Sequence, residues 1–378
     1  MKGSRPASAC FPGALVNRRA RASPCFRRGG GWIRGLIAGV LLTIGLAAAG
    51  CASAVLAPRI VTAPNVGGHS PTLLSQAPET RVALARLYAR TLRVPVPGSQ
   101  PAEIALAVLE PGDYRHTRSV TVQPDSRGRP HYHVDSHWEP LSDGPPRLEP
   151  TATIVLLHGF WMSREAVLHW GLHLAEAGYR TVLVDMRGHG ASTGAWVTFG
   201  ALEAADLSAV LDTLQREGLA GPRIGVLGVS YGASVGLQWA ARDPRVRAIV
   251  ALEPFADARL AIRQYARAVL SPAANRALSD GAITAATRRA GRLAGFRWEA
   301  TDVAAAVGRL QVPVLFVHGT ADTVIPADHS RRLHALAPAG SRLVEVPGED
   351  HFTLSMRLEP FAAEVEAWFA AAFSGSGR

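Results

Sequence analysis

The second half of the chain alternates short apolar runs with stretches of helical periodicity. The apolar runs are Thr153–Leu157, Thr181–Val184, Ile224–Gly228, Ala248–Leu252, Val314–Val317 and Arg342–Val346. The helical stretches between them include Arg164–Ala177, Ala201–Arg216 and Ala233–Ala241. Apolar runs separated by helices are typical of parallel strands that are buried on both faces. The pattern therefore predicts an α/β domain with a mostly parallel central sheet and helices on both faces.

Other segments follow different patterns. The longest interval between strands, Ala256–Gln311, has Ala-rich and Arg-rich helical periodicity with Gly breaks, which predicts a small helical cap inserted into the domain. Pro58–Ser75 reads as a linker, and Pro78–Arg93 as one amphipathic helix. Ser119–Gln123 and His131–Glu139 alternate on either side of a turn and predict a β-hairpin.

These signals divide the chain into four parts. We expect a basic N-terminal segment over residues 1–35 and a signal sequence or membrane anchor over 36–57. A linker with one helix follows over 58–110, and the α/β domain occupies 111–378, with its cap at about 256–311.

The positive charge of the chain is concentrated in its first part. The net charge of the 378 residues is +10, but eight basic residues precede position 51 and the first acidic residue is Glu79. Removing those eight charges from the total leaves +2 for the rest. Because a nucleic-acid-binding protein carries its charge on the folded surface, we expect no nucleic-acid partner.

An export signal is indicated by the apolar run Leu36–Ala57, which has no charge over 22 residues and follows the basic segment. It contains Ala48-Ala49-Gly50-Cys51, which resembles the lipobox of bacterial lipoproteins and predicts lipidation of Cys51. A helix of this length spans about 33 Å, so an uncleaved signal-anchor and simple cleavage remain alternatives. Each outcome places the body in the bacterial cell envelope, facing the periplasm or exterior, and the first two anchor it to the membrane.

Candidate chemistry begins at Gly228-Val229-Ser230-Tyr231-Gly232, which fits the pattern G-x-S-x-G. The motif lies between a predicted strand and a predicted helix, where a tight turn forces the serine into an exposed, strained position. The helix N-terminus adds positive potential where negative charge develops. Ser230 is therefore the candidate nucleophile.

A serine nucleophile needs a base, and the base needs an acid that orients it. Asp322 and His351 follow the strands Val314–Val317 and Arg342–Val346, in the order serine, acid, histidine. Glu253 and Asp257 follow an earlier strand and are alternative acids. Asp350 is disfavoured because consecutive residues point apart.

Five ordered motifs now give the sequence a clear resemblance to the α/β-hydrolase superfamily, and within it to its serine aminopeptidase-like and lysophospholipase-like group. The motifs are HGF (158–160), DMRGHGAS (185–192), GVSYG (228–232), HGTADTVIP (318–326) and GEDHF (348–352). The resemblance implies the α/β-hydrolase fold, with Ser230 as nucleophile, His351 as general base and Asp322 as acid. It also implies an oxyanion hole formed by the backbone N–H groups of Phe160 and Tyr231.

These residues predict a serine hydrolase that cleaves a carboxylic ester or related acyl compound through an acyl-enzyme. A peptidase or acyltransferase with the same triad is the first alternative, and a non-catalytic binding protein of the same fold is the second. We expect a small-molecule acyl substrate, no cofactor and no metal; the oligomeric state is left open.

One group of residues resembles a metal cluster. The side chains of His131, His133, Asp135 and His137 alternate along a predicted strand and therefore face one side of it. Ligands in a row along one flat strand do not all converge on one ion, so we interpret this row as a solvated face of the hairpin.

Overall fold

The structure is a computed structural model, and it describes residues 7–8, 49–66, 78–124, 130–138, 149–359 and 361–374. The predicted basic segment, apart from residues 7–8, and most of the predicted signal run therefore lie outside the described residues. Within the described residues, no helix combines the length and hydropathy needed to cross a membrane.

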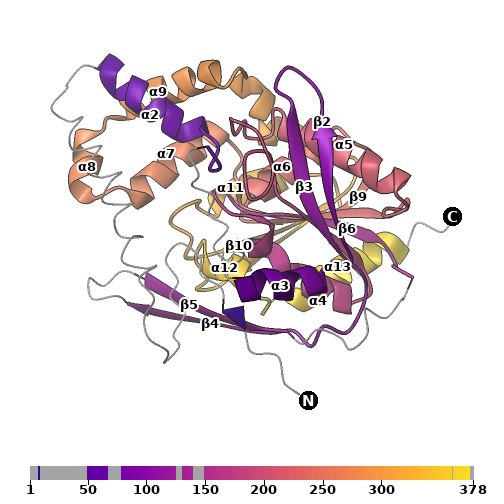
Figure 1. Cartoon of the computed structure of the whole chain (residues 1–378). Helices are drawn as coiled ribbons and strands as arrows, with labels where there is room; N and C mark the ends of the chain where they lie inside the picture. The colour runs from indigo at the N-terminus through magenta and orange to yellow at the C-terminus, as the bar shows by residue number, and fades with distance from the viewer. Residues whose placement is uncertain are drawn as a thin grey trace.

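An eight-stranded sheet forms the centre of the molecule (Figure 1), in the order β11-β10-β9-β8-β6-β7-β3-β2. Its parallel strands are β6 (Thr153–Leu157), β7 (Arg180–Val184), β8 (Ile224–Val229), β9 (Val246–Leu252), β10 (Val314–Gly319) and β11 (Arg342–Val346). Two antiparallel strands, β2 (Arg90–Val96) and β3 (Ala102–Leu109), complete one edge. The mostly parallel sheet expected from the sequence is confirmed.

Helices cover both faces of the sheet, which explains why its strands are apolar throughout. Along β6, Val155 and Leu157 pack into the core on one face, while Ile154 and Leu156 pack into the core on the other. The first face is covered by α5 (Glu203–Arg216), α6 (Tyr231–Ala240), α10 (Val303–Val307) and α11 (Asp328–Leu336). The second is covered by α3 (Pro78–Leu87), η2 (Arg164–Val167), α4 (Leu168–Glu176), α12 (Thr353–Met356) and α13 (Ala362–Ser374).

The long interval after β9 is helical, as its periodicity indicates. It holds α7 (Ala258–Val269), α8 (Pro272–Ala277), α9 (Asp280–Leu293), η3 (Trp298–Thr301) and α10. Helix α2 (Ala49–Val61) packs against α9, and the two lie side by side in Figure 1. We refer to residues 256–311 as the cap.

The segment 58–110 differs from the predicted linker with one helix, because it contributes two strands to the main sheet. The expected helix ends at Leu87, and β2 begins at Arg90. Pro95 lies within β2 and is tolerated because β2 is an edge strand, where a missing N–H breaks no second ladder. Upstream, Asn65 donates side-chain hydrogen bonds to the carbonyls of Gly190 (2.9 Å) and Ser192 (2.8 Å), so residues near 65 are docked on the domain.

The predicted hairpin is present as β4 (Thr117–Pro124) and β5 (Pro130–His137), which pair antiparallel. A two-residue strand, β1 (Ala7–Ser8), pairs with β5 to give a separate three-stranded sheet. The inward face of β5 presents Tyr132 and Val134, which pack with Met356 of α12. The hairpin therefore lies against the loop that follows β11.

Candidate active site

Ser230 occupies a sharp turn between β8 and α6. Its backbone angles are φ +51° and ψ −110°, in a region that side-chain-bearing residues rarely adopt. Its N–H donates to the carbonyl of Leu252 on the neighbouring strand β9 at 2.7 Å, which helps hold the turn in place. Such strain is characteristic of a serine presented at the top of a strand for attack on a substrate.

The glycines on either side of the turn are required by close packing. A Cβ added at Gly228 would lie 2.5 Å from the backbone nitrogen of Ala233, and one at Gly232 would lie 2.4 Å from the carbonyl oxygen of Leu157. Neither contact can be relieved by moving a flexible side chain, since both involve backbone atoms. The motif G-x-S-x-G therefore fixes how closely α6 approaches β6 and β8.

Three loops at the carboxyl ends of the strands bring the predicted triad together. Ser230 Oγ lies 3.1 Å from His351 Nε2, and His351 Nδ1 lies 2.7 Å from Asp322 Oδ2. The three residues come from the ends of β8, β11 and β10, respectively. The hydroxyl, the imidazole and the carboxylate thus form one continuous hydrogen-bonded chain.

Asp322 is held in its ionised form by the groups around it. Its Oδ1 accepts hydrogen bonds from the N–H groups of Val324 and Ile325, both at 2.8 Å. Burial by itself would raise the pKa of Asp322, but hydrogen bonds from His318 and His351 outweigh burial and lower that pKa below its usual range. A permanently charged carboxylate suits the acid that supports an imidazolium.

The two residues whose amides are expected to form an oxyanion hole contact each other through their side chains. The rings of Phe160 and Tyr231 contact each other, with centroids 5.9 Å apart. Across the described residues, neither backbone N–H donates a hydrogen bond, so both are free to bind an oxygen atom. Tyr231 is also the first residue of α6, where helix geometry leaves the N–H without an intrahelical acceptor.

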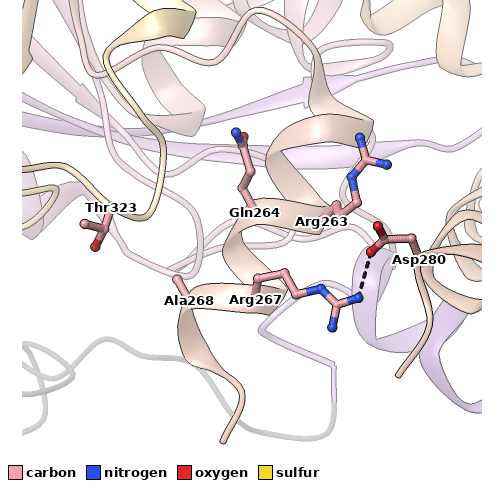
Figure 2. Close-up of a pocket in the computed structure, with 6 residues that line it drawn as sticks. All are labelled: Arg263, Gln264, Arg267, Ala268, Asp280 and Thr323. Carbon is pink, nitrogen blue, oxygen red and sulfur yellow. Dashed lines mark hydrogen bonds and ion pairs between the residues drawn. The ribbon is translucent and has the colours of Figure 1, made fainter. Parts of the chain in front are cut away.

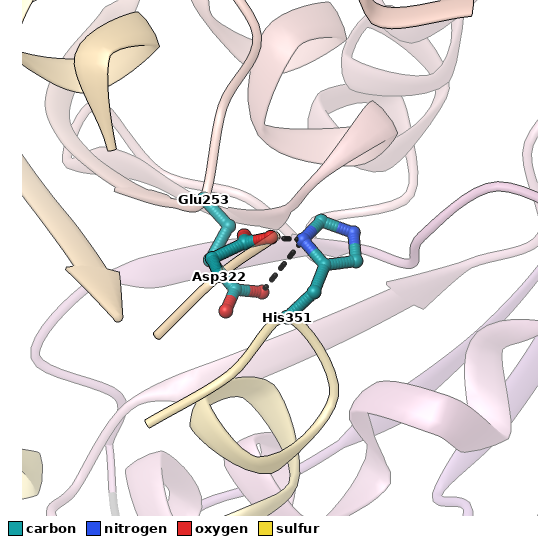
Figure 3. Close-up of side chains that lie close together, drawn as sticks. All are labelled: Glu253, Asp322 and His351. Carbon is teal, nitrogen blue, oxygen red and sulfur yellow. Dashed lines mark hydrogen bonds and ion pairs between the residues drawn. The ribbon is translucent and has the colours of Figure 1, made fainter. Parts of the chain in front are cut away.

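The alternative acids occupy distinct positions. Asp257 caps α7, accepting from the N–H groups of Arg259 (2.8 Å) and Leu260 (3.0 Å). Asp350 accepts from backbone N–H groups of its own turn. Glu253 is different, because its Oε2 lies 3.8 Å from His351 Nδ1 (Figure 3). Asp322 makes the short contact to the same nitrogen, so the geometry favours Asp322 as the acid.

The motif around 185–192 forms a buried structural loop. Asp185 accepts from the N–H groups of Arg164 (2.7 Å) and Ala191 (2.9 Å). His158 donates from Nδ1 to the carbonyl of Gly159 at 2.8 Å and accepts at Nε2 from the N–H of Met186 at 3.1 Å. Because burial lowers the pKa of His158 to about 4, this imidazole is neutral and ties two loops together.

The loop that carries His351 has a contact that the sequence does not reveal. Tyr132 on β5 donates from its hydroxyl to Asp350 Oδ2 at 2.9 Å, and its ring contacts that of Phe352, with centroids 5.4 Å apart. No local motif marks this pair, because 218 positions separate the two hydrogen-bonded residues. The hairpin thus braces the residues on both sides of His351.

The face of β5 that carries the histidine row does not join the triad. His133 Nε2 lies 3.3 Å from Asp135 Oδ2 along the same strand. The group of His, Cys, Asp and Glu that comes close enough for a shared ion among the described residues is Glu253, Asp322 and His351, whose candidate ligand atoms lie within 4.8 Å of one another.

A cavity of about 410 Å³ lies between α7 and the loop after β10 (Figure 2). Its lining includes Arg263, Gln264, Arg267, Ala268, Asp280 and Thr323. Arg267 is neutralised by Asp280, with 2.7 Å between Nη2 and Oδ1. Arg263 has no hydrogen-bond or ion-pair partner among the residues that the structure describes. Thr323 directly follows Asp322 in the chain, whereas Ser230, Asp322 and His351 are not among these lining residues.

A model of the alpha/beta hydrolase family matches residues 154–365. The chain belongs to this family. Among curated relatives, YqkD of Bacillus subtilis is 28% identical over 207 residues, covering 54% of this chain and 62% of that protein. YfhR of Escherichia coli K12 is 29% identical over 217 residues, covering 56% of this chain and 66% of that protein. Both relatives are named as uncharacterized, and the chain spans slightly less than two thirds of each.

Solved structures of α/β-hydrolases share the fold at low sequence identity. The esterase Pf2001 of Pyrococcus furiosus is similar with a TM-score of 0.52 and 17% identity, over 77% of this chain and 95% of that chain. A 2,6-dihydroxy-pseudo-oxynicotine hydrolase gives a TM-score of 0.52 and 18% identity, over 91% of this chain and 87% of that chain. At such identities the likeness establishes the fold, and the chemistry is argued from the site.

Proposed function

We propose that the protein is a serine hydrolase that cleaves a carboxylic ester or related acyl substrate through an acyl-enzyme on Ser230. The observation that carries the proposal is the hydrogen-bonded chain Ser230–His351–Asp322, with distances of 3.1 Å and 2.7 Å. A serine hydroxyl is a weak nucleophile alone, and a neighbouring imidazole oriented by a carboxylate activates it.

In the first half of the reaction, His351 Nε2 accepts the proton of Ser230 Oγ as that oxygen attacks the carbonyl carbon of the substrate. The N–H groups of Phe160 and Tyr231 bind the oxyanion, while Asp322 stabilises the imidazolium through Nδ1–H. The tetrahedral intermediate then collapses, and His351 donates its proton to the leaving group.

In the second half, water attacks the acyl-enzyme. His351 now takes a proton from the water, the oxyanion hole binds the same oxygen again, and collapse returns the proton to Ser230 Oγ. This cycle releases the carboxylic acid and restores the free enzyme without an added cofactor.

The cavity between α7 and the loop after β10 supports a more specific substrate. Arg263 is a half-buried guanidinium that interacts with the charge of Asp280 but forms no hydrogen bond or close ion pair in the described residues, whereas its neighbour Arg267 does both. A guanidinium in this state suits a carboxylate or phosphate on the substrate. We therefore include an acidic group, distant from the scissile bond, in the proposed substrate.

We also propose that the protein is tethered to the envelope membrane through its N-terminal segment, with Cys51 lipidated. The support is the apolar run that includes Cys51, preceded by the basic segment. A diacylated cysteine supplies two acyl chains, which is enough for stable attachment. Helix α2 includes Cys51 and is docked on α9, so the tether would leave the domain beside the cap.

The catalytic proposal is tested with a series of p-nitrophenyl esters and matched anilides. Ser230→Ala should lower kcat by several orders of magnitude, because the nucleophile acts as a unit with its base. Ser119→Ala, at an exposed position of β4, is the matched control and should retain hydrolysis. Hydrolysis by Ser230→Ala at the wild-type rate would refute the proposal, and preference for anilides would make the enzyme a peptidase.

A further inference from the structure

A second carboxyl group stands beside the triad with no assigned role. Glu253 directly follows β9, is fully buried, and has φ +53°, a conformation that costs free energy for a residue with a side chain. Its N–H donates to the carbonyl of Val317 on β10 at 2.9 Å, so its backbone is tied between two central strands. The structure thus holds this side chain at the edge of the sheet where the triad assembles.

The surroundings of the Glu253 carboxyl give it no structural hydrogen bond. Neither oxygen has a hydrogen-bond partner among the described residues. Oε2 lies 3.8 Å from His351 Nδ1, the nitrogen that Asp322 Oδ2 contacts at 2.7 Å. Figure 3 shows the two carboxyl groups directed at the same ring nitrogen. Burying an unpartnered carboxyl is costly, so a purely structural role leaves its presence unexplained.

Their surroundings shift the pKa values of the Glu253 and Asp322 carboxyl groups in opposite directions. Burial, then the negative charges of Asp322 on the β10 loop and of Asp350 and Glu349 on the β11 loop, raise the pKa of Glu253 well above its ordinary value. In the part of the chain that the structure describes, the positively chargeable group within 4.0 Å of the Glu253 carboxyl is His351. Two close carboxylates do not both ionise readily, so with Asp322 charged, Glu253 remains a neutral acid.

We propose that Glu253 is a positioning residue and reserve acid of the triad. With Asp322 present, the neutral carboxyl packs against the imidazole of His351 and keeps water from Nδ1. When the charge of Asp322 is removed, Glu253 loses its proton to solvent and accepts the hydrogen bond from His351 Nδ1–H. This role rests on the proposed serine hydrolase mechanism and adds a second acid to it.

The test compares kcat/KM for a p-nitrophenyl ester across four variants and pH 5–10. Asp322→Asn should lower kcat/KM about 10⁴-fold, because the amide occupies the place of the carboxylate beside His351 and disturbs the imidazole tautomer. Asp322→Ala leaves the space beside His351 Nδ1 open for the Glu253 carboxylate, so it should lower kcat/KM by only about 10²-fold. Adding Glu253→Gln to Asp322→Ala should lower activity at least tenfold further. Glu253→Gln alone should lower it about threefold, since the amide keeps the shape of the neutral acid.

The pH profile separates this role from simple packing. Deprotonation of His351 gives kcat/KM a rising limb with pH in every variant. In Asp322→Ala, ionisation of Glu253 should add a second rising limb, which should be absent from the double variant. The matched control is Glu299→Gln in the Asp322→Ala background, an exposed glutamate of the cap, which should change the rate less than threefold. Melting temperatures report whether each variant is folded. We expect Asp322→Asn to fold, because its side-chain oxygen still accepts hydrogen bonds from the N–H groups of Val324 and Ile325.

Two results would overturn the inference while leaving the mechanism standing. One is equal activity and an identical pH profile of Asp322→Ala and the double variant, with Ser230→Ala inactive. The other is a loss in Glu253→Gln as large as that in Asp322→Asn, which would make Glu253 the working acid. Hydrolysis by Ser230→Ala would instead overturn the proposed function itself.

Discussion

Removing the hydroxyl of Tyr132 should destabilise the loop that carries His351. Tyr132 is 6% exposed, and its hydroxyl donates to Asp350 at 2.9 Å. Asp350 Oδ1 accepts from the N–H groups of Phe352 (2.9 Å) and Thr353 (2.8 Å), so one carboxylate links the hairpin to both residues after His351. A hydrogen bond to a charged group contributes about 1.5–3 kcal/mol. Because water can reach the half-buried Asp350, we expect Tyr132→Phe to cost about 1.5 kcal/mol.

Urea unfolding and steady-state kinetics measure the two consequences. The free energy of unfolding should fall by about 1.5 kcal/mol, which lowers Tm by roughly 2–5 °C. The value of kcat should fall severalfold with KM nearly unchanged, because the loop positions the base and does not bind the substrate. A double-mutant cycle with Asp350→Asn isolates the pair. Additive losses in this cycle, or an unchanged Tm in Tyr132→Phe, would refute the reasoning.

The other predictions concern pH, substrate charge and the tether. Burial lowers the pKa of His189 to about 3, below the 6.5 of the unfolded chain, so its contribution to stability is complete above pH 6.5 and is lost as the pH falls. Between pH 6.5 and 5 this contribution is roughly 2 kcal/mol. Over that pH range, the free energy of unfolding measured with urea should therefore fall by that much less in His189→Asn than in the wild-type protein. An equal fall in both proteins would contradict the lowered pKa of His189. Arg263→Gln should raise KM about tenfold for esters that carry a distal carboxylate and leave neutral esters unchanged; equal effects on both would exclude an anion site. Cys51→Ser should give a larger, uncleaved precursor by intact mass of membrane-extracted protein, and full-length, unmodified mass in both proteins would contradict lipidation.

The sequence was sufficient to predict the central strands and three candidate residues that the structure brings into one hydrogen-bonded chain. Each parallel strand is an apolar run because both of its faces are buried, and such runs can be recognised in the sequence alone. Ser230 could be found because the close packing at Gly228 and Gly232 leaves a local signature. Asp322 and His351 could be found because parallel strands place their following loops at one edge of the sheet.

What the sequence did not reveal depends on contacts between distant segments. The first residues of β2, up to Arg93, were predicted to end a helix, and Pro95 was predicted to lie in a break. The place of β2 in the sheet follows from pairing with β3. Glu253 was one of two acidic residues after a strand, and the structure distinguishes the two: Glu253 is buried 3.8 Å from His351, whereas Asp257 caps α7. Tyr132 lies in a hairpin outside the residues matched by the family model, so no motif connects it to the site.

The central claim is that Ser230 forms the acyl-enzyme, and a fluorophosphonate probe tests it most directly. The purified protein is incubated with the probe, digested, and the modified peptide is sequenced by tandem mass spectrometry. The account predicts one stoichiometric phosphonyl adduct on Ser230, absent from Ser230→Ala and much slower to form in a His351→Ala variant. Absence of labelling in the folded wild-type protein, or an adduct on another residue that persists in Ser230→Ala, would contradict it.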